Sequence, residues 1–519
     1  MSLKRRDFLA RAAALGVLFT LPVIGCSDDS GSDTDSGSGG TAGDGDGDGL
    51  PTYEYDGPTG DAATFEHGVA SGDPLADSVI LWTRVSLGSL AGEIGDAAVD
   101  VFLEVSRDRD FTQRVAAEYL QTSGDRDHTV KVDAAELESG TTYYFRFSAL
   151  GVTSKTGRTK TAADGSPERL RLGVVSCSNF AYGYFHAYRH LGNRPDLDAV
   201  VHLGDYIYEY ENGGYGTLRE CEPPTEIVSL ADYRLRYSQY RRDADLQFVH
   251  QQNPFICIWD DHEYTNDPTE GGAENHQPDQ EGDWNERKAV ALQAFSEWIP
   301  CRVDAGVDVY RTLMFGDLVQ LTLADRLHGY LYPEEGADTW SSFGDTQATW
   351  LQGQIEGATA TWLLLGSQSL FNSLGTLYGG WDGAEQVVYD ALKVTETRNF
   401  VSIGGDIHNF GALAVRDDDV DVGVEFICGS VTSPGVGFLS TLQNTVYGEA
   451  EERGYLLLTF TPTRMAADFW TFPDAQKNSP SLPAEGLGAS FEVMEGANVL
   501  VAKTEPEPTF DDAPPVVPE

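Results

Sequence analysis

The chain has 519 residues, of which 41% are hydrophobic and 11% aromatic, so it can form two or three domains with real cores and is not disordered as a whole. Its formal net charge is −47, which argues against nucleic acid as the main partner and against basic docking on anionic lipid. An anionic substrate would therefore need local positive charge, and metal ions are the obvious source of it.

Residues 1–26 are typical of a signal peptide. The basic run Lys4-Arg5-Arg6 precedes Phe8-Leu9 and an apolar stretch that ends at Gly25, and paired arginines in this context indicate the twin-arginine export route. Cys26 directly after a small residue resembles a lipoprotein cleavage box, so a lipidated Cys26 would tether the protein to a membrane. The alternative is an ordinary signal peptide with an incidental cysteine. Both alternatives predict a periplasmic or cell-surface protein.

Two regions follow the leader before the main domain. Residues 27–60 begin with a run of Ser, Asp, Gly and Thr and are interpreted as a flexible linker. Residues 61–165 contain short β-rich runs at 79–84, 99–106 and 141–147, separated by turn clusters. Short strands at this spacing predict a small all-β sandwich domain.

Residues 166–504 change to an alternation of strands and helices. Apolar runs of strand length occur at 172–176, 199–203, 255–259, 319–323, 362–365 and 400–403. Helix-length segments such as 230–242 and 284–298 lie between them, which predicts a layered α/β sheet. Residues 505–519 are acidic and rich in proline, and we expect them to be a frayed tail.

Potential metal ligands follow four of the predicted strands. They are Cys177, Asp205 with Tyr208, Asp261 with His262, and Asp406 with His408. Ligands of α/β sheets bind outside the carboxyl ends of the strands, so we expect these side chains to converge on one metal site.

The ligand types indicate which metals bind. Thiolate and phenolate are strong donors, so Cys177 and Tyr208 point to a ferric ion, which His408 also suits. The carboxylates of Asp205, Asp261 and Asp406 suit a harder ion such as Ca²⁺, and Asp205 could bridge two metals. His262 would face a bound phosphate as a hydrogen-bond donor or leaving-group acid. Arg219 is a candidate for holding a phosphate oxygen, the alternative being a plain surface charge.

These motifs resemble a known family. Cys177, Gly204-Asp205-x-x-Tyr208, Asp261-His262-Glu263 and Gly405-Asp406-x-His408 are similar to the scaffold of purple acid phosphatases, with the substitutions found in PhoD-type alkaline phosphatases. The similarity runs from Phe65 to Trp470. It implies a layered metallophosphoesterase fold, ferric iron plus calcium, and hydrolysis of phosphodiesters and phosphomonoesters at alkaline pH. By position, the iron ligands would be Cys177, Asp205, Tyr208 and His408, and the calcium ligands Asp205, Asp261 and Asp406.

One block departs from the family pattern. The family's Leu-Asp-Thr-Arg is present here as Leu323-Ala324-Asp325-Arg326, so substrate contacts near it are expected to differ.

Four cysteines remain after Cys26 is assigned to lipid and Cys177 to metal. Cys221, Cys257, Cys301 and Cys428 allow two disulfides in an oxidising compartment. Buried free thiols are an equal alternative for Cys257 and Cys428, which lie in apolar runs.

The sequence therefore predicts an exported metal-dependent hydrolase of phosphate esters. Two alternatives stay open: a surface-tethered binding module with a structural metal, and a phosphodiesterase acting on phospholipid or teichoic-acid-type polymers.

Overall fold

The computed structural model describes residues 48–95, 97–303, 308–331, 343–372, 384–395, 399–436 and 444–519, together with the two-residue strand β1 (Phe19–Thr20). The rest of the predicted signal peptide, including Cys26, lies outside the described residues, as does most of the predicted linker. Within the described ranges, no helix is both long enough and apolar enough to cross a membrane.

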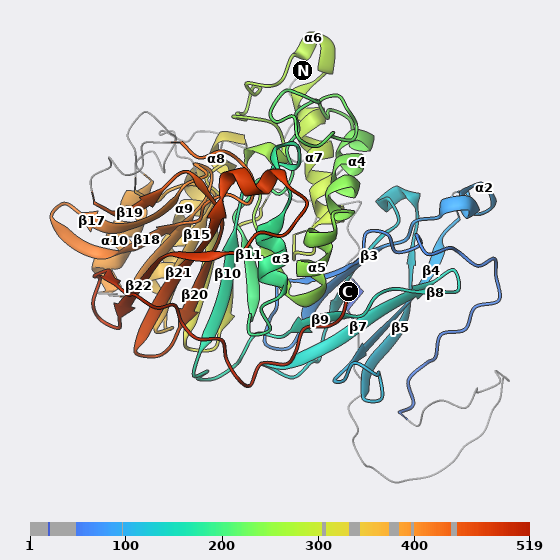
Figure 1. The fold of residues 1–519 in the computed structure, drawn as a ribbon, viewed down its shortest axis with the longest axis horizontal. Coiled ribbons are helices and arrows are strands. Elements are labelled where there is room, and N and C mark those ends of the chain that lie inside the picture. The colour runs from blue at the N-terminus through green and yellow to red at the C-terminus, as the bar shows by residue number, and fades with distance from the viewer. Residues whose placement is uncertain are drawn as a thin grey trace.

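The largest sheet of the described chain has eleven strands, among them β10, β11, β20, β21 and β22 in the middle and left of Figure 1. Its central strands β12, β11 and β10 are parallel, and antiparallel strands extend the sheet beyond β10. In order across the sheet, the strands are β1, β6 (Thr129–Ala134), β3 (Val79–Arg84), β2 (Val69–Gly72), β12 (Pro254–Cys257), β11 (Ala199–His202), β10 (Leu170–Val175), β20 (Glu452–Phe460), β21 (Arg464–Pro473), β22 (Gly486–Met494) and β23 (Val501–Ala502).

A second sheet carries the later predicted strands. Its inner strands β14, β15, β16 and β18 are mutually parallel, and antiparallel strands border them on both sides. In spatial order, the described strands are β13 (Arg311–Phe315), β14 (Val319–Ala324), β15 (Trp362–Ser367), β16 (Phe400–Gly404), β18 (Val420–Ile427), β17 (Phe410–Asp417) and β19 (Thr445–Glu449).

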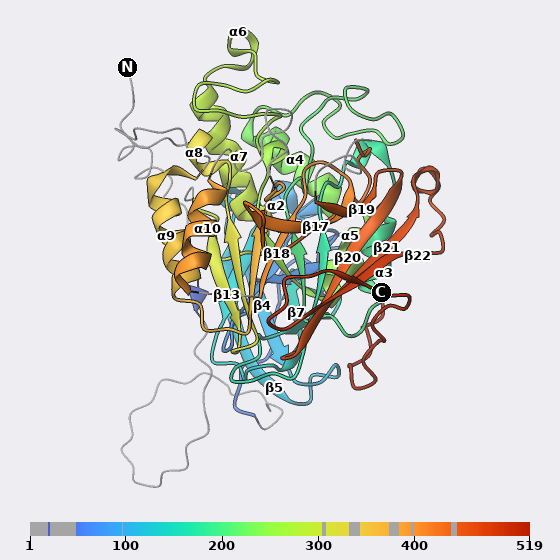
Figure 2. The ribbon, with the colours of Figure 1, turned by 90° about the vertical axis from the view of Figure 1, so that its left-hand side faces the viewer.

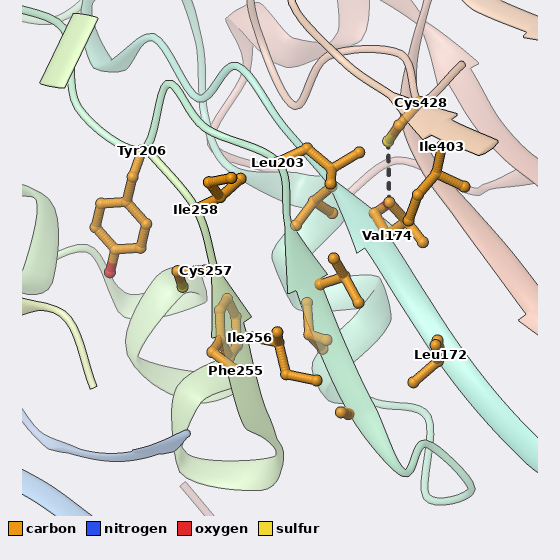
Figure 3. Packing of buried hydrophobic residues seen from close by; sticks show 14 of the residues in the cluster. Leu172, Val174, Leu203, Tyr206, Phe255, Ile256, Cys257, Ile258, Ile403 and Cys428 are labelled. Carbon is orange, nitrogen blue, oxygen red and sulfur yellow. Dashed lines mark hydrogen bonds between the residues drawn. The ribbon is translucent and has the colours of Figure 1, made fainter. Parts of the chain in front are cut away.

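The two sheets share one hydrophobic core. Figure 3 shows Val174 of β10 beside Ile403 of β16 and Cys428, whose Sγ is 3.1 Å from the carbonyl oxygen of Val174, and Leu172 of β10 belongs to the same cluster. Successive side chains of β15 point to opposite faces of the sheet, and both faces are buried. Leu364 belongs to the core between the sheets, whereas Leu363 and Leu365 pack in a separate cluster with helices.

Helices cover the outer faces of both sheets. On the second sheet, α9 (Gly344–Glu356) and α10 (Glu385–Thr395) contribute Leu351, Val388 and Leu392 to the cluster around Leu363 (Figure 2). The helices that pack on the first sheet are α3 (His186–Gly192), α4 (Leu230–Arg241), α5 (Ala244–Gln252) and α7 (Trp284–Trp298). Shorter helices are α2 (Ala91–Ile94), α6 (Pro278–Glu281) and α8 (His328–Leu331). The chain thus combines mixed sheets with flanking helices.

The N-terminal region is a sheet region, as predicted, but it is not separate from the main body. Its own five-stranded sheet contains β5 (Arg114–Thr122), β4 (Val99–Ser106), β7 (Thr142–Ala149), β8 (Val152–Thr153) and β9 (Gly157–Lys160). This sheet shares a core with β3 and β6, whereas β2 pairs in parallel with β12 of the main body. The large sheet therefore contains strands from both sides of the boundary that the sequence predicted between residues 165 and 166.

The C-terminal tail is docked, which corrects the expectation that it is frayed. Phe510 lies between the guanidinium groups of Arg169 and Arg171, 3.8 and 3.9 Å from its ring centre. Val517 is 2% exposed and exchanges hydrogen bonds with the side chain of Gln252. The tail stays in place through the packing of Phe510 and Val517 and through hydrogen bonds of its backbone, such as those of Val517 with Gln252.

The five described cysteines are buried and none forms a disulfide. Of the two alternatives for Cys257 and Cys428, the structure therefore has the free thiols.

Candidate metal centre

Each predicted ligand lies just beyond the carboxyl end of a parallel strand. Cys177 follows β10, Asp205 follows β11, Asp261 follows β12 and Asp406 follows β16. Cys177, Asp205 and Asp406 have positive φ angles of 59°, 56° and 66°. A left-handed residue turns the chain sharply, and such strain gathers at functional sites. These turns bring side chains of two different sheets to one place.

The four predicted iron ligands meet. Cys177, Asp205 and His408 offer ligand atoms that all lie within 4.8 Å of one another. The Tyr208 hydroxyl is 2.8 Å from Asp205 Oδ2 and 3.3 Å from His408 Nε2. Local contacts orient Tyr208 and His408. Ser433 Oγ lies 2.8 Å from the Tyr208 hydroxyl, and His408 Nδ1 lies 2.8 Å from the carbonyl oxygen of Pro434.

A second group of ligand atoms shares Asp205 with the first. It consists of Asp205, Asp261 and His262, again within 4.8 Å of one another. Asp406, predicted to accompany Asp205 and Asp261, lies close by, since Arg326 Nη2 is 3.4 Å from Asp406 Oδ2 and 3.2 Å from Asp260 Oδ1. The two groups of possible metal ligands therefore overlap at the Asp205 carboxylate.

Burial makes the negative charge of these groups costly. It raises the pKa of Asp205 and Asp260 well above the ordinary range, and burial together with the charge of Asp205 does the same to the pKa of the Cys177 thiol and the Tyr208 phenol. Asp205 Oδ1 and Asp260 Oδ2 are buried without a hydrogen-bond partner. Buried, unpaired oxygens next to thiol and phenol donors fit a bound cation, which would offset the desolvation of all four groups.

His262 is held and charged by a buried carboxylate. Its Nδ1 is 2.7 Å from Glu209 Oε2, and its ring stacks on Tyr208 with centres 4.1 Å apart. Burial alone would lower the pKa of His262, but the charges of Asp261 and Glu209 raise it well above the usual range. Burial would raise the pKa of Glu209, yet the charge and hydrogen bond of His262 lower it to about 2. A protonated His262 is a hydrogen-bond donor.

Glu263 joins two of the ligand-bearing turns, a role not predicted from the sequence. Its carboxylate accepts hydrogen bonds from the backbone N–H groups of Asp205 (3.1 Å), Tyr206 and Asp260 (2.6 Å). It lies in the 3-10 turn η4 (Asp261–Glu263) and is 2% exposed. The Asp-His-Glu motif contains Glu263, but its partner Asp205 lies 58 residues away along the chain. The motif by itself therefore did not indicate this contact.

Arg326, for which the sequence predicted no role, lies beside the ligand groups, whereas Arg219 contacts other residues. Arg326, on the turn after β14, contacts Asp260 and Asp406 beside the ligand groups, and its Nε is buried without a partner. Arg219, the predicted phosphate contact, donates to Gly183 O (3.2 Å) and Asp243 Oδ2 (2.8 Å) and lies 3.5 Å from the ring centre of Phe180. The departure in the Leu323–Arg326 block was the signal for Arg326.

Comparison with known proteins identifies the architecture. The family model described as PhoD-like phosphatase matches residues 172–469, and the model of the PhoD-like phosphatase N-terminal domain matches residues 54–163. Alkaline phosphatase D of Bacillus subtilis (strain 168) is 31% identical over 459 residues, which cover 79% of this chain and 78% of the relative.

A solved structure agrees over nearly the same length. The structure titled "Structure of PhoD" superimposes with a TM-score of 0.78 at 30% sequence identity, covering 87% of this chain and 94% of the other. The chain belongs to the PhoD-like phosphatase family and is a phosphoric ester hydrolase.

Proposed function

We propose that the protein hydrolyses phosphomonoesters and phosphodiesters at a ferric iron–calcium centre. The iron ligands would be Cys177, Asp205, Tyr208 and His408, and the calcium ligands Asp205, Asp261 and Asp406. The observation that carries the proposal is the position of Asp205 in both ligand groups. When bound, such a metal pair supplies the Lewis acidity that polarises a phosphate ester and activates water.

The side chains around the ligands have separate tasks. His262, kept protonated by Glu209, donates a hydrogen bond to the phosphate or a proton to the leaving oxygen. Arg326 neutralises part of the carboxylate charge and has donors left for a phosphate oxygen. Arg219 remains a predicted phosphate contact, which would require it to leave Asp243.

We extend the proposal to the fold and the location of the protein. The shared core of two sheets and the flanking helices support a layered metallophosphoesterase fold in 166–504, preceded by a sandwich in 61–165. Export by the twin-arginine route, with a membrane tether at Cys26, rests on the sequence alone. Family membership favours a hydrolase over the tethered binding module.

Replacement of Asp205 tests the centre directly. We expect Asp205→Asn and Cys177→Ala to reduce hydrolysis of bis-p-nitrophenyl phosphate and p-nitrophenyl phosphate by at least about 100-fold, with iron lost from the purified protein. EGTA is expected to abolish activity, and added Ca²⁺ to restore it. The control is Asp100→Asn on β4, an exposed carboxylate of the N-terminal sheet.

Three results would contradict the proposal. Full activity of Asp205→Asn would show that Asp205 is not a shared metal ligand. Purified protein that is active without iron would show that the ferric ion is not needed. Activity that persists in EGTA would show that calcium is not needed for hydrolysis. Assays with phospholipid and teichoic-acid polymers then decide whether either is a substrate.

A further inference from the structure

Three tyrosines lie together beside the candidate metal centre. Tyr182, Tyr210 and Tyr215, here called the tyrosine cluster, come from the 3-10 turn η3 (Phe180–Tyr182) and from the loop that leads from β11 to α4. The Tyr215 ring is central: its centre is 5.4 Å from that of Tyr210 and 5.7 Å from that of Tyr182.

The cluster adjoins residues of the site through ring contacts. The Tyr215 ring centre is 5.9 Å from that of Tyr208, and the Tyr210 ring centre is 5.5 Å from that of His262. A group attached to a phosphate at the ligand groups would therefore have aromatic surface within a few ångströms on this side.

The cluster is open to a ligand. All three side chains are partly exposed, whereas Tyr208 and His262 are buried. Within the described residues, the hydroxyl groups of Tyr182, Tyr210 and Tyr215 make no hydrogen bond. Buried tyrosines normally find a partner for the hydroxyl, and partly exposed ones supply an apolar ring with a polar tip, which is the character of a binding surface.

The loop anchors the backbone on both sides of the Tyr215 ring's attachment point. Its carbonyl oxygen accepts from Asn179 Nδ2 at 3.1 Å, and Leu218 N donates to Ala181 O at 2.8 Å. Gly216 has a φ of 107°, and a Cβ there would lie 2.7 Å from the backbone carbon of Ala181. Only glycine permits this approach. A pre-positioned ring loses little entropy when a ligand stacks on it.

We propose that the tyrosine cluster binds the organic group of the phosphate ester and favours a planar ring, such as an aryl group or a nucleobase. The inference rests on the proposed function, because the phosphate must be held at the ligand groups. A neutral ring gains by stacking on tyrosine, whereas a small alkyl group gains little there. Lys477 Nζ lies 4.8 Å from the Tyr182 ring centre, but its charge is paired with Asp474 at 2.8 Å.

Inhibition by phosphonates separates the ring from the phosphate. Phenylphosphonate and methylphosphonate present the same acid group, and neither is hydrolysed as an ester. We expect Tyr215→Leu to raise the inhibition constant of phenylphosphonate about tenfold and that of methylphosphonate less than twofold. Tyr215→Phe keeps the ring and is expected to keep the wild-type ratio of the two constants. The matched control is Tyr119→Leu, a tyrosine 43% exposed on the N-terminal sheet.

The outcomes distinguish this inference from the proposed function. Equal inhibition constants of wild type and Tyr215→Leu for phenylphosphonate would overturn the inference while hydrolysis remains intact. An equal rise for both phosphonates, or loss of iron, would also overturn it, because Tyr215 would then act by supporting Tyr208. If the wild-type protein neither hydrolyses bis-p-nitrophenyl phosphate nor binds either phosphonate, the proposed function fails and the inference fails with it.

Discussion

The buried carboxylates around the centre divide into two kinds. Asp205 and Asp260 each keep an oxygen without a partner, so they have a free acceptor for a cation. Glu263 and Glu209 instead use their oxygens on the protein itself, on backbone N–H groups and on His262. In the proposed centre Asp205 would bind metal, Asp260 pairs with Arg326 beside it, and the two glutamates hold the surrounding turns in place.

Replacement of Glu263 tests this division. A glutamine keeps one acceptor oxygen, but its NH₂ group must face a backbone N–H, because three such groups surround the carboxylate. We expect Glu263→Gln to lower the free energy of unfolding by about 3 kcal/mol and to reduce hydrolysis at least tenfold. Urea unfolding and the bis-p-nitrophenyl phosphate assay measure the two effects.

The control for Glu263 is Glu286→Gln, an exposed glutamate on α7. Wild-type stability in Glu263→Gln would show that the backbone contacts contribute nothing. Normal stability with lost activity would assign Glu263 to the chemistry rather than to placement.

At the scale of elements, the turns after the parallel strands define the site. The turn after β11 passes so close to the chain after β12 that a Cβ on Gly204 would lie 2.5 Å from the Cβ and 2.8 Å from the backbone nitrogen of Asp260. Gly204 also has a φ of 101°. Asp205 and Asp260 are thus brought together by a position that only glycine can occupy.

A methyl group at this position should separate the two turns. We expect Gly204→Ala to lower the free energy of unfolding by about 2–3 kcal/mol and to reduce hydrolysis at least tenfold. The control is Gly353→Ala within α9, where a Cβ meets nothing within 4 Å. That change should add about 0.5–1 kcal/mol of stability and leave hydrolysis unaltered. Equal behaviour of the two variants would refute the argument from close approach.

The sequence pattern predicted several single helices and strands close to their observed bounds. The segments 230–242 and 284–298 were expected as helices and form α4 (Leu230–Arg241) and α7 (Trp284–Trp298). The run 362–365 was expected as a buried strand and lies in β15 (Trp362–Ser367). Helix periodicity and continuous apolar runs are local signals, and both kinds of element bury the residues that produced the signal.

At the scale of the whole molecule, the C-terminal tail connects parts that lie far apart in sequence. Val517 packs with Phe111 and Tyr144 of the N-terminal region, while Phe510 packs on Arg171 of the main body. The C terminus accordingly lies beside β9 and α5 (Figure 1). The tail is a strap across both parts of the chain.

Removal of the strap should cost stability rather than catalysis. We expect deletion of residues 510–519 to lower the free energy of unfolding by about 2–4 kcal/mol, since Phe510 and Val517 lose their packing. Hydrolysis at 25 °C should stay within twofold of wild type, because the tail contacts described above do not involve the ligand groups. Val517→Asp should reproduce most of the loss, and Val499→Asp, at a residue 54% exposed, should not. An unchanged thermal unfolding midpoint after the deletion would show that the tail does not stabilise the fold.

The sequence by itself determined which side chains stand after which buried strands, and hence the class of chemistry. This was readable because strand burial, turn residues and ligand types are properties of short segments. The contacts of Glu263 and Arg326, the tyrosine cluster and the docked tail were decided only by the tertiary structure. Each depends on contacts between segments distant in the chain, as in the 80 residues between Arg326 and Asp406, and local patterns carry no information about how such segments meet.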